Sequence, residues 1–168
     1  AYPQFESLLA GFLADTADHR CDGACFGVAG PVQDNRSITT NLPWQLDAGE
    51  LAAALGFGPV WLLNDLEATA WGIAALDDED FAELQPGAPA SSGNRAVIAA
   101  GTGLGEAGMF WDGRHHRPFA SEGGHADFSP NDELEIELWR FLRRRYEHLS
   151  WERVLSGPGL VNLYEFMR

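Results

Sequence analysis

Three polar side chains that could hold or activate a ligand stand close together in residues 119–128, which read Phe-Ala-Ser-Glu-Gly-Gly-His-Ala-Asp-Phe. Glu122 and His125 flank two glycines, and Asp127 follows two residues later. Adjacent glycines make a tight turn that exposes the backbone and lets a ligand approach it closely. The segment therefore predicts either a binding loop or a polar surface turn, and other parts of the chain are needed to distinguish the two.

A second candidate site lies where an apolar segment, residues 59–63, ends in Asn64 and Asp65. A strand over this segment, followed by a helix over residues 66–75, would place both side chains where open α/β sheets bind ligands. A carboxylate at that position can accept a proton from a hydroxyl group. The simpler alternative is that Asp65 only caps the following helix.

Gly101, Thr102 and Gly103 directly follow a strand that we predict over residues 95–100. Glycines let backbone N–H groups turn toward an anion, and the threonine hydroxyl adds a donor, so this turn is a candidate phosphate loop. It is not a Walker motif, because the chain contains no lysine. A hairpin rather than a helix is expected next, which argues against a dinucleotide fingerprint. An ordinary turn is the alternative.

Glu122, His125 and Glu152 are acceptors suited to the vicinal hydroxyl groups of a polyol, provided that the fold brings them together. His125 as a metal ligand is an alternative, but Glu-Gly-Gly-His has no cysteine or histidine partner beside it. A glycosidase with Asp65 and Glu122 as paired carboxylates is a further alternative. A serine hydrolase does not fit, because the chain has no Gly-x-Ser-x-Gly segment.

An α/β framework is expected to position these residues. Apolar periodicity predicts helices over residues 5–17, 48–55, 132–146 and 160–167, and residues 77–85 are expected to form an acidic helix. Residues 24–32 are expected to form a buried strand that ends in a turn, since Gly30 and Pro31 stand near the end of the run. A second buried strand is predicted over residues 95–100, and a hairpin over residues 107–111 and 114–119.

Side-chain chemistry predicts where several of these elements begin and end. Asp47 and Asp132 are expected to cap helices, and Ser150 a short helical turn that contains Glu152. Asp112 and Gly113 are typical of a hairpin turn. Residues 157–159, Gly-Pro-Gly, are expected to break the chain before the last helix.

The composition excludes some partners and chemistries. The chain has 168 residues, a formal net charge of −14, and 11 basic residues that are all arginine. Such an acidic chain repels nucleic acid and anionic membranes, so we expect neither as a partner. Without lysine, Schiff-base chemistry and a lysine general base are excluded.

The two cysteines and the chain ends suggest a piece of a cytoplasmic protein. Cys21 and Cys25 are too few for a zinc site and wrongly spaced for a redox Cys-x-x-Cys, so we expect reduced, partly buried thiols. The apolar runs are too short for a membrane span. The chain opens and stops inside helical patterns, which we interpret as an internal fragment of a longer protein.

Six segments occur in an order that strongly resembles the bacterial ATP-dependent glucokinase family, over nearly the whole chain. They are Gly-Pro-Val at 30–32, Thr-Asn at 40–41, Asn-Asp at 64–65, Gly-Thr-Gly-Leu-Gly at 101–105, Glu-Gly-Gly-His-Ala-Asp-Phe at 122–128 and Glu-Arg-Val-Leu-Ser-Gly-Pro-Gly-Leu-Val-Asn-Leu-Tyr at 152–164. The resemblance implies an α/β fold of the actin-like ATPase (ribonuclease H-like) superfold. It implies a two-domain sugar kinase with the cleft between the domains, only partly represented here.

Within that fold, the resemblance places residues 1–76 in the small domain, 77–94 in a connecting segment and 95–168 in the large domain. Asp65 resembles the catalytic base that takes a proton from the glucose 6-hydroxyl. Sugar ligands would be Asn41, Asn64, Glu122, His125 and Glu152. Gly101, Thr102 and Gly103 would contact the phosphates of ATP.

The resemblance also implies the ligands and the setting. Magnesium would arrive with ATP rather than occupy a site made by the protein alone. The partners would be glucose and ATP, in the cytoplasm, and the family allows a homodimer of the full-length protein. The alternative is a sugar-binding regulator or sensor of the same superfold without kinase turnover, although such a sensor would more readily have lost Asp65.

The resemblance generates a first test. The family's first phosphate motif and its adenosine motif fall outside residues 1–168, so we expect the purified 168-residue chain to have no kinase activity and to be weakly stable. An enzymatic assay for glucose 6-phosphate, with a full-length glucokinase as positive control, checks this. Detectable glucose 6-phosphate production by the chain would contradict the expectation.

Overall fold

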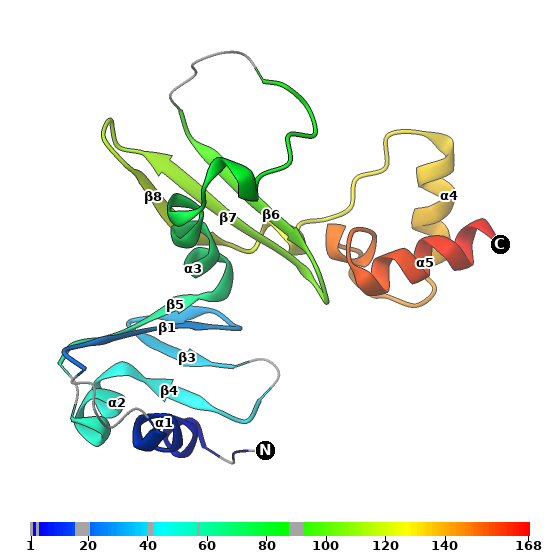
Figure 1. The fold of residues 1–168 in the computed structure, drawn as a ribbon. Coiled ribbons are helices and arrows are strands. Elements are labelled where there is room, and N and C mark those ends of the chain that lie inside the picture. The colour runs from blue at the N-terminus through cyan, green and yellow to red at the C-terminus, as the bar shows by residue number, and fades with distance from the viewer. Residues whose placement is uncertain (1, 3, 16–20, 40–41, 57, 88–92) are drawn as a thin grey trace. The chain divides into compact units, whose positions relative to one another are not determined.

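The structure is a computed structural model that describes residues 2, 4–15, 21–39, 42–56, 58–87 and 93–168. The chain divides into two compact units, residues 1–72 and residues 73–168, which are described one at a time. Figure 1 labels their elements. The predicted domain limits at residues 76 and 94 stay predictions for the complete protein.

Two small sheets form the first unit. Strand β1 (Ala24–Val28) runs parallel to β5 (Val60–Asn64), while β2 (Val32–Gln33), β3 (Arg36–Ile38) and β4 (Gln45–Asp47) form an antiparallel sheet. Asp34 and Asn35 join β2 to β3 with φ of 51° and 59°, the left-handed values that a tight hairpin turn requires. The Asn35 amide then donates to the Val60 carbonyl oxygen at 2.9 Å and accepts from the Leu62 N–H at 2.7 Å. This one side chain therefore fastens the hairpin to β5.

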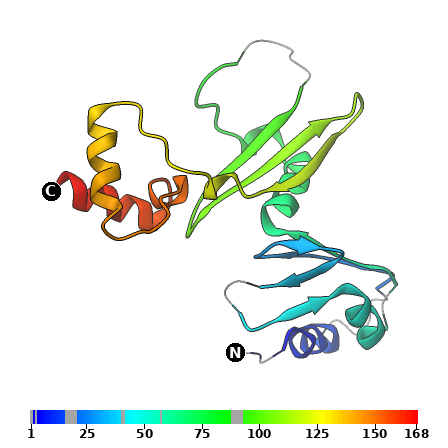
Figure 2. The same cartoon turned by 180° about the vertical axis from the view of Figure 1, so that it is seen from behind.

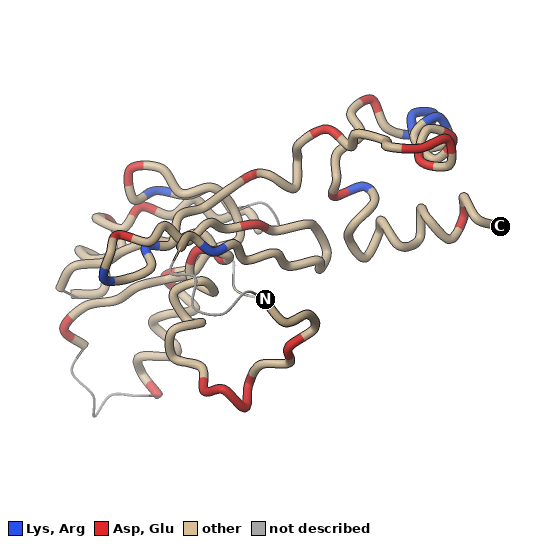
Figure 3. The backbone as a smooth tube through the Cα atoms, turned by 90° about the horizontal axis from the view of Figure 1, so that it is seen from above, with Lys and Arg blue, Asp and Glu red and all other residues tan. Residues whose placement is uncertain are grey.

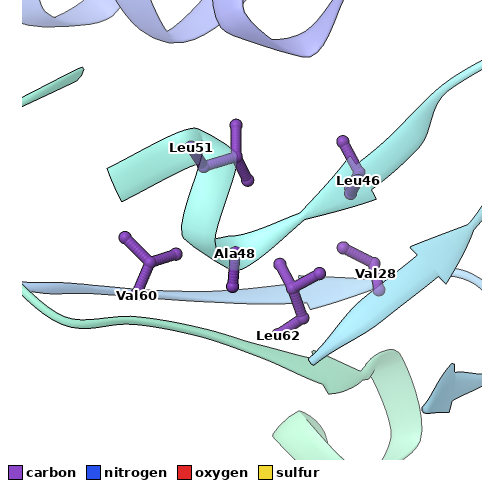
Figure 4. Close-up of a cluster of buried hydrophobic side chains, with 6 residues drawn as sticks. All are labelled: Val28, Leu46, Ala48, Leu51, Val60 and Leu62. Atoms are coloured by element: carbon purple, nitrogen blue, oxygen red, sulfur yellow. The ribbon is translucent and has the colours of Figure 1, made fainter. Parts of the chain in front are cut away.

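The core of the first unit lies between these strands and helix α2 (Ala48–Leu55), with α1 (Phe5–Asp15) at its border. The buried side chains shown in Figure 4 are Val28, Leu46, Ala48, Leu51, Val60 and Leu62. Asp47 caps α2 by accepting from the N–H groups of Gly49 and Glu50, which confirms the predicted cap. Its pKa is lowered, chiefly by the hydrogen bond from the Arg36 side chain.

One expectation for the first unit is confirmed and another is wrong. Residues 24–32 form a strand that ends in a turn, as predicted: β1 stops at Val28, and Gly30 adopts a φ of 147° before β2 begins. The thiols of Cys21 and Cys25 are free but exposed, since the core covers only part of β1. The predicted helix over residues 5–17 is described as far as Asp15.

The second unit begins with an antiparallel sheet of β6 (Arg95–Ala100), β7 (Leu104–Trp111) and β8 (His116–Ser121). The turn between β7 and β8 is organised by Asp112, whose carboxylate accepts from the N–H groups of Arg114 and His115 and from Arg117 Nε. The His115 N–H first, and then the Arg117 side chain, hold the Asp112 pKa well below its usual range. The hairpin prediction is confirmed, but β6 is largely exposed rather than buried.

Two helices that pack against each other complete the second unit (Figures 1 and 2). Helices α4 (Glu133–Leu142) and α5 (Gly157–Met167) pack together on a core of Phe128, Leu138, Leu142, Leu149 and Val154. Asp132 caps α4 as predicted, although the helix ends at Leu142 instead of residue 146.

The predicted break at residues 157–159 is wrong, because these residues form the first turn of α5. Ser156 caps the helix by accepting from the Gly159 N–H. Pro158 fits the first turn because a residue there needs no backbone N–H, and proline has none.

The acidic segment 77–85 also differs from its prediction. Only a short 3-10 turn forms, Asp78–Asp80, and the whole segment is exposed, so no apolar face holds a helix against the core. Acidic residues outnumber basic ones along the backbone that the structure describes (Figure 3). Among the described helices, none has both the length and the apolar character to cross a membrane.

Leu142 generates a stability prediction for the second unit. Its side chain is fully buried among the helices, so Leu142→Ala should lower the free energy of unfolding by about 2–5 kcal/mol. Leu84→Ala, at a position that is 98% exposed, is the matched control and should change it by less than about 0.5 kcal/mol. Urea titration followed by circular dichroism compares the two variants; equal losses would contradict the assigned core.

Candidate active site

Asn64 ends β5 and uses its side chain to shape the chain that follows. Its Oδ1 accepts from the N–H groups of Leu66 and Glu67, at 3.0 and 3.3 Å, and its Nδ2 donates to the Gly30 carbonyl oxygen at 3.2 Å. The side chain of Asn64 therefore caps α3 (Asp65–Gly72). Among the described residues, Nδ2 makes only this one hydrogen bond.

Asp65 is exposed at the first position of α3. Its Oδ1 accepts from the Leu66 N–H at 3.0 Å, and its backbone carbonyl accepts from the Thr69 hydroxyl. Asn64 and Asp65 both accept from the Leu66 N–H, and Asn64 also accepts from the Glu67 N–H, so the two side chains share the capping of α3.

The loop of Glu122 and His125 follows β8 directly. Residues Gly123–His125 form one 3-10 turn, in which the His125 N–H donates to the Glu122 carbonyl oxygen at 3.0 Å. Gly124 is buried, and a Cβ on it would lie 2.1 Å from the carbonyl oxygen of Leu104, at the start of β7. Only glycine allows this approach, so the second glycine of the loop is a packing requirement.

Glu152 reaches the same place from a distant part of the chain. The N–H of Trp151 donates to the Ala126 carbonyl oxygen at 3.0 Å, and the N–H of Phe128 to that of Leu149 at 2.9 Å. This pairing sets the short turn Trp151–Arg153 beside the loop that ends at His125. Ser150 precedes the turn as predicted, although its side chain makes no capping bond.

His125 lies between two carboxylates. Its Nδ1 is 3.3 Å from Glu122 Oε2, and its Nε2 is 4.0 Å from Glu152 Oε1. The side chains of Glu122 and His125 are 70% and 60% exposed, whereas that of Glu152 is 18% exposed. We call Glu122, His125 and Glu152 the acceptor cluster. The polyol-binding interpretation of the sequence required these three side chains to lie close together, and in the second unit they do.

The Gly-Thr-Gly segment forms the turn between β6 and β7, and we call residues 101–104 the glycine turn. The N–H of Gly101 donates to the Gly103 carbonyl oxygen at 2.8 Å, and the N–H of Gly157 to that of Gly101 at 2.7 Å. The N–H of Leu104 donates to Glu152 Oε2 at 3.2 Å. The glycine turn is therefore in direct contact with the acceptor cluster.

The remaining candidates have different outcomes. Asn41 lies outside the described residues, and Asn64 and Asp65 belong to the first unit. Asp127 pairs with His148, with Oδ1 2.6 Å from Nε2. Within the described ranges, no group of three histidine, cysteine or acidic residues could hold a metal ion, which gives no support to His125 as a metal ligand.

Two contributors to this site escaped the sequence analysis. The Leu104 N–H is a backbone group and carries no residue signature. Glu106 is the other: its Oε2 would be 2.0 Å from a Cβ on Gly123, so its carboxylate lies against the loop. The register of the predicted hairpin, which pairs Glu106 with Ser121 just before the loop, is the signal that could have identified it.

Comparisons with known proteins agree with the motifs. A glucokinase family model matches residues 1–168, so the chain belongs to the glucokinase family. The glucokinase of Nostoc punctiforme is 38% identical over 169 residues, covering 99% of this chain and 50% of that protein. The Synechocystis glucokinase is 44% identical over 148 residues, covering 86% of this chain and 42% of its own length. The chain spans about half the length of the curated relatives it matches.

Solved structures show the same fold. The glucokinase of an Antarctic psychrotroph superposes with a TM-score of 0.83 at 30% identity, over 99% of this chain and 52% of that one. The Balamuthia mandrillaris glucokinase, solved in complex with glucose, gives 0.72 at 25% identity, over 96% and 51%. The predicted α/β glucokinase fold, only partly represented, is confirmed.

Gly124 generates a prediction for the site. Gly124→Ala would press a methyl group into the Leu104 backbone, so we expect a loss of about 1–3 kcal/mol in the free energy of unfolding. Gly87→Ala is the matched control, because nothing lies within 4 Å of the added Cβ. Urea titration measures both variants. A Gly124→Ala protein as stable as its control would disprove the close contact.

Proposed function

We propose that the complete gene product containing this chain transfers a phosphoryl group from ATP to the 6-hydroxyl of glucose, giving glucose 6-phosphate and ADP. The observation that carries the proposal is the acceptor cluster in hydrogen-bonded contact with the glycine turn. Membership of the glucokinase family supports it. A relative of the same fold was solved in complex with glucose, which supports the choice of sugar.

The acceptor cluster has the chemistry to hold a sugar ring. The carboxylates of Glu122 and Glu152 accept hydrogen bonds from hydroxyl groups, and His125 between them can accept or donate. Asn64, in the first unit, stays a predicted ligand on the family resemblance. Asn41 stays a predicted ligand on the family resemblance. These groups fit a gluco-type ring, in which neighbouring hydroxyls call for several acceptors.

Asp65 is proposed as the general base. Its carboxylate would take the proton of the sugar 6-hydroxyl, the hydroxyl oxygen would form a bond to the γ-phosphorus of ATP, and the bond from that phosphorus to the leaving oxygen of ADP would break. The capping bonds of Asn64 support this role, because they hold the chain that presents Asp65.

The glycine turn fits phosphate groups. Thr102 is exposed, and the N–H groups of Thr102 and Gly103 and the Thr102 hydroxyl make no hydrogen bond within the described part of the chain, so they would bind phosphate oxygens. Magnesium bound to ATP supplies positive charge on the transferred group when present. Backbone donors suit a chain without lysine.

The cellular location and the partners follow from composition and from the family resemblance. Two free, exposed cysteines suit a reducing cytoplasm, which we propose as the location. A net charge of −14 supports the absence of nucleic-acid and anionic-membrane partners. A homodimer is proposed on the family resemblance alone.

Asp65→Asn tests the kinase against a sugar sensor without turnover. In the complete gene product, loss of the base should lower kcat by about 10²–10⁴-fold, while the Kd for glucose stays within about threefold. A coupled assay of glucose 6-phosphate and isothermal titration calorimetry measure the two quantities.

Asp132→Asn is the matched control for this test. It makes the same change at a helix cap where asparagine caps equally well, so kcat should not change. Full activity of Asp65→Asn would remove Asp65 from the mechanism. Glucose binding without any turnover by the unmodified gene product would support the sensor instead.

A further inference from the structure

The two carboxylate oxygens of Glu152 point to two different parts of the site. Oε2 accepts from the Leu104 N–H at 3.2 Å, in the glycine turn, and Oε1 is 4.0 Å from His125 Nε2. The side chain is mostly buried, at 18% exposure, unlike the exposed Glu122. A carboxylate that is largely withdrawn from water needs donors, and the Leu104 N–H is one.

The backbone that carries Glu152 is held firmly. Its carbonyl oxygen accepts from the Ser156 hydroxyl at 2.7 Å, and the next carbonyl, of Arg153, accepts from Asn162 Nδ2 at 2.9 Å. Ser156 and Asn162 are both buried. Because the backbone at Glu152 is fixed, movement of the carboxylate and movement of the glycine turn depend on each other.

Gly103 shows how close this contact is. A Cβ at Gly103 would lie 2.5 Å from Glu152 Oε2. A Cβ at Gly101, two residues earlier in the same turn, would have nothing within 4 Å. Neither glycine has a positive φ, so the backbone conformation allows alanine at both positions, and the two substitutions differ in their contact with Glu152.

We propose that Glu152 is a positioning residue for the glycine turn as well as a sugar ligand. Through its bond to Leu104, glucose affinity and nucleotide affinity depend on one side chain inside the second unit. The proposal rests on the proposed function, because it takes the acceptor cluster as the sugar site and the glycine turn as the phosphate site. Linkage requires that the dependence run in both directions.

The forward test measures glucose binding without nucleotide. In the complete gene product, Gly103→Ala should push the Glu152 carboxylate from its place and raise the Kd for glucose about tenfold, the effect of losing one charged hydrogen bond. Gly101→Ala, whose methyl group enters open space, should leave that Kd within about twofold. Isothermal titration calorimetry gives both values, and equal melting temperatures show that the difference is not a loss of folding.

The reverse test measures MgATP binding without sugar. Glu152→Ala should raise the Kd for MgATP about fivefold, because the Leu104 N–H loses its acceptor. Glu122→Ala removes the same charge from the acceptor cluster but has no bond to the glycine turn among the described contacts, so it controls for charge.

The outcomes separate the two proposals. If the unmodified protein binds no glucose, the proposed function and this inference both fail. If it binds glucose but Gly103→Ala and Gly101→Ala have the same glucose Kd, the inference alone is overturned. Equal MgATP affinities of Glu152→Ala and Glu122→Ala overturn it as well, and that comparison holds even if Gly103→Ala does not fold.

Discussion

The main chain of residues 101–104 is the constraint on which the candidate site in the second unit depends. Gly124 packs against the Leu104 carbonyl, the Leu104 N–H bonds to Glu152, and the Gly157 N–H bonds to Gly101. These three contacts bring the loop after β8, the turn before α5 and α5 itself onto one turn. Since they use backbone atoms, the acceptor cluster keeps its geometry only while the glycine turn keeps its own.

The bond between Leu104 and Glu152 also affects which hydrogen-bond donors of the glycine turn can face an anion. A chain with a net charge of −14 and no lysine has few cationic side chains for an anionic ligand, so backbone N–H groups become important donors. The glycine turn has few such donors, and the Leu104 N–H is committed to Glu152. That bond compensates a mostly buried carboxylate, while the N–H groups of Thr102 and Gly103 make no hydrogen bond among the described residues. In the proposed function, these two N–H groups are the donors for phosphate.

Features that depend on neighbouring residues could be predicted from the sequence, whereas features that depend on tertiary packing could not. The caps at Asp47 and Asp132 and the Asp112 hairpin were predicted because each depends on residues next to it. The exposure of β6 was not predicted, because it depends on what covers the sheet. Residues 157–159 were predicted as a break because a glycine–proline pair suits a break as well as the start of a helix. For the site, residue types identified the acceptor cluster, while Leu104 contributes only backbone.

The order of Asn64 and Asp65 has its own physical reason. Asn64 accepts from two N–H groups and donates to the Gly30 carbonyl, a combination that an amide can make and a carboxylate cannot. An aspartate at residue 64 would place a second acceptor against the Gly30 carbonyl oxygen, and its other carboxylate oxygen would bond to the N–H groups of the helix. With the amide making these three bonds, the carboxylate of Asp65 remains exposed to solvent. An exposed carboxylate at this position is what the proposed general base requires.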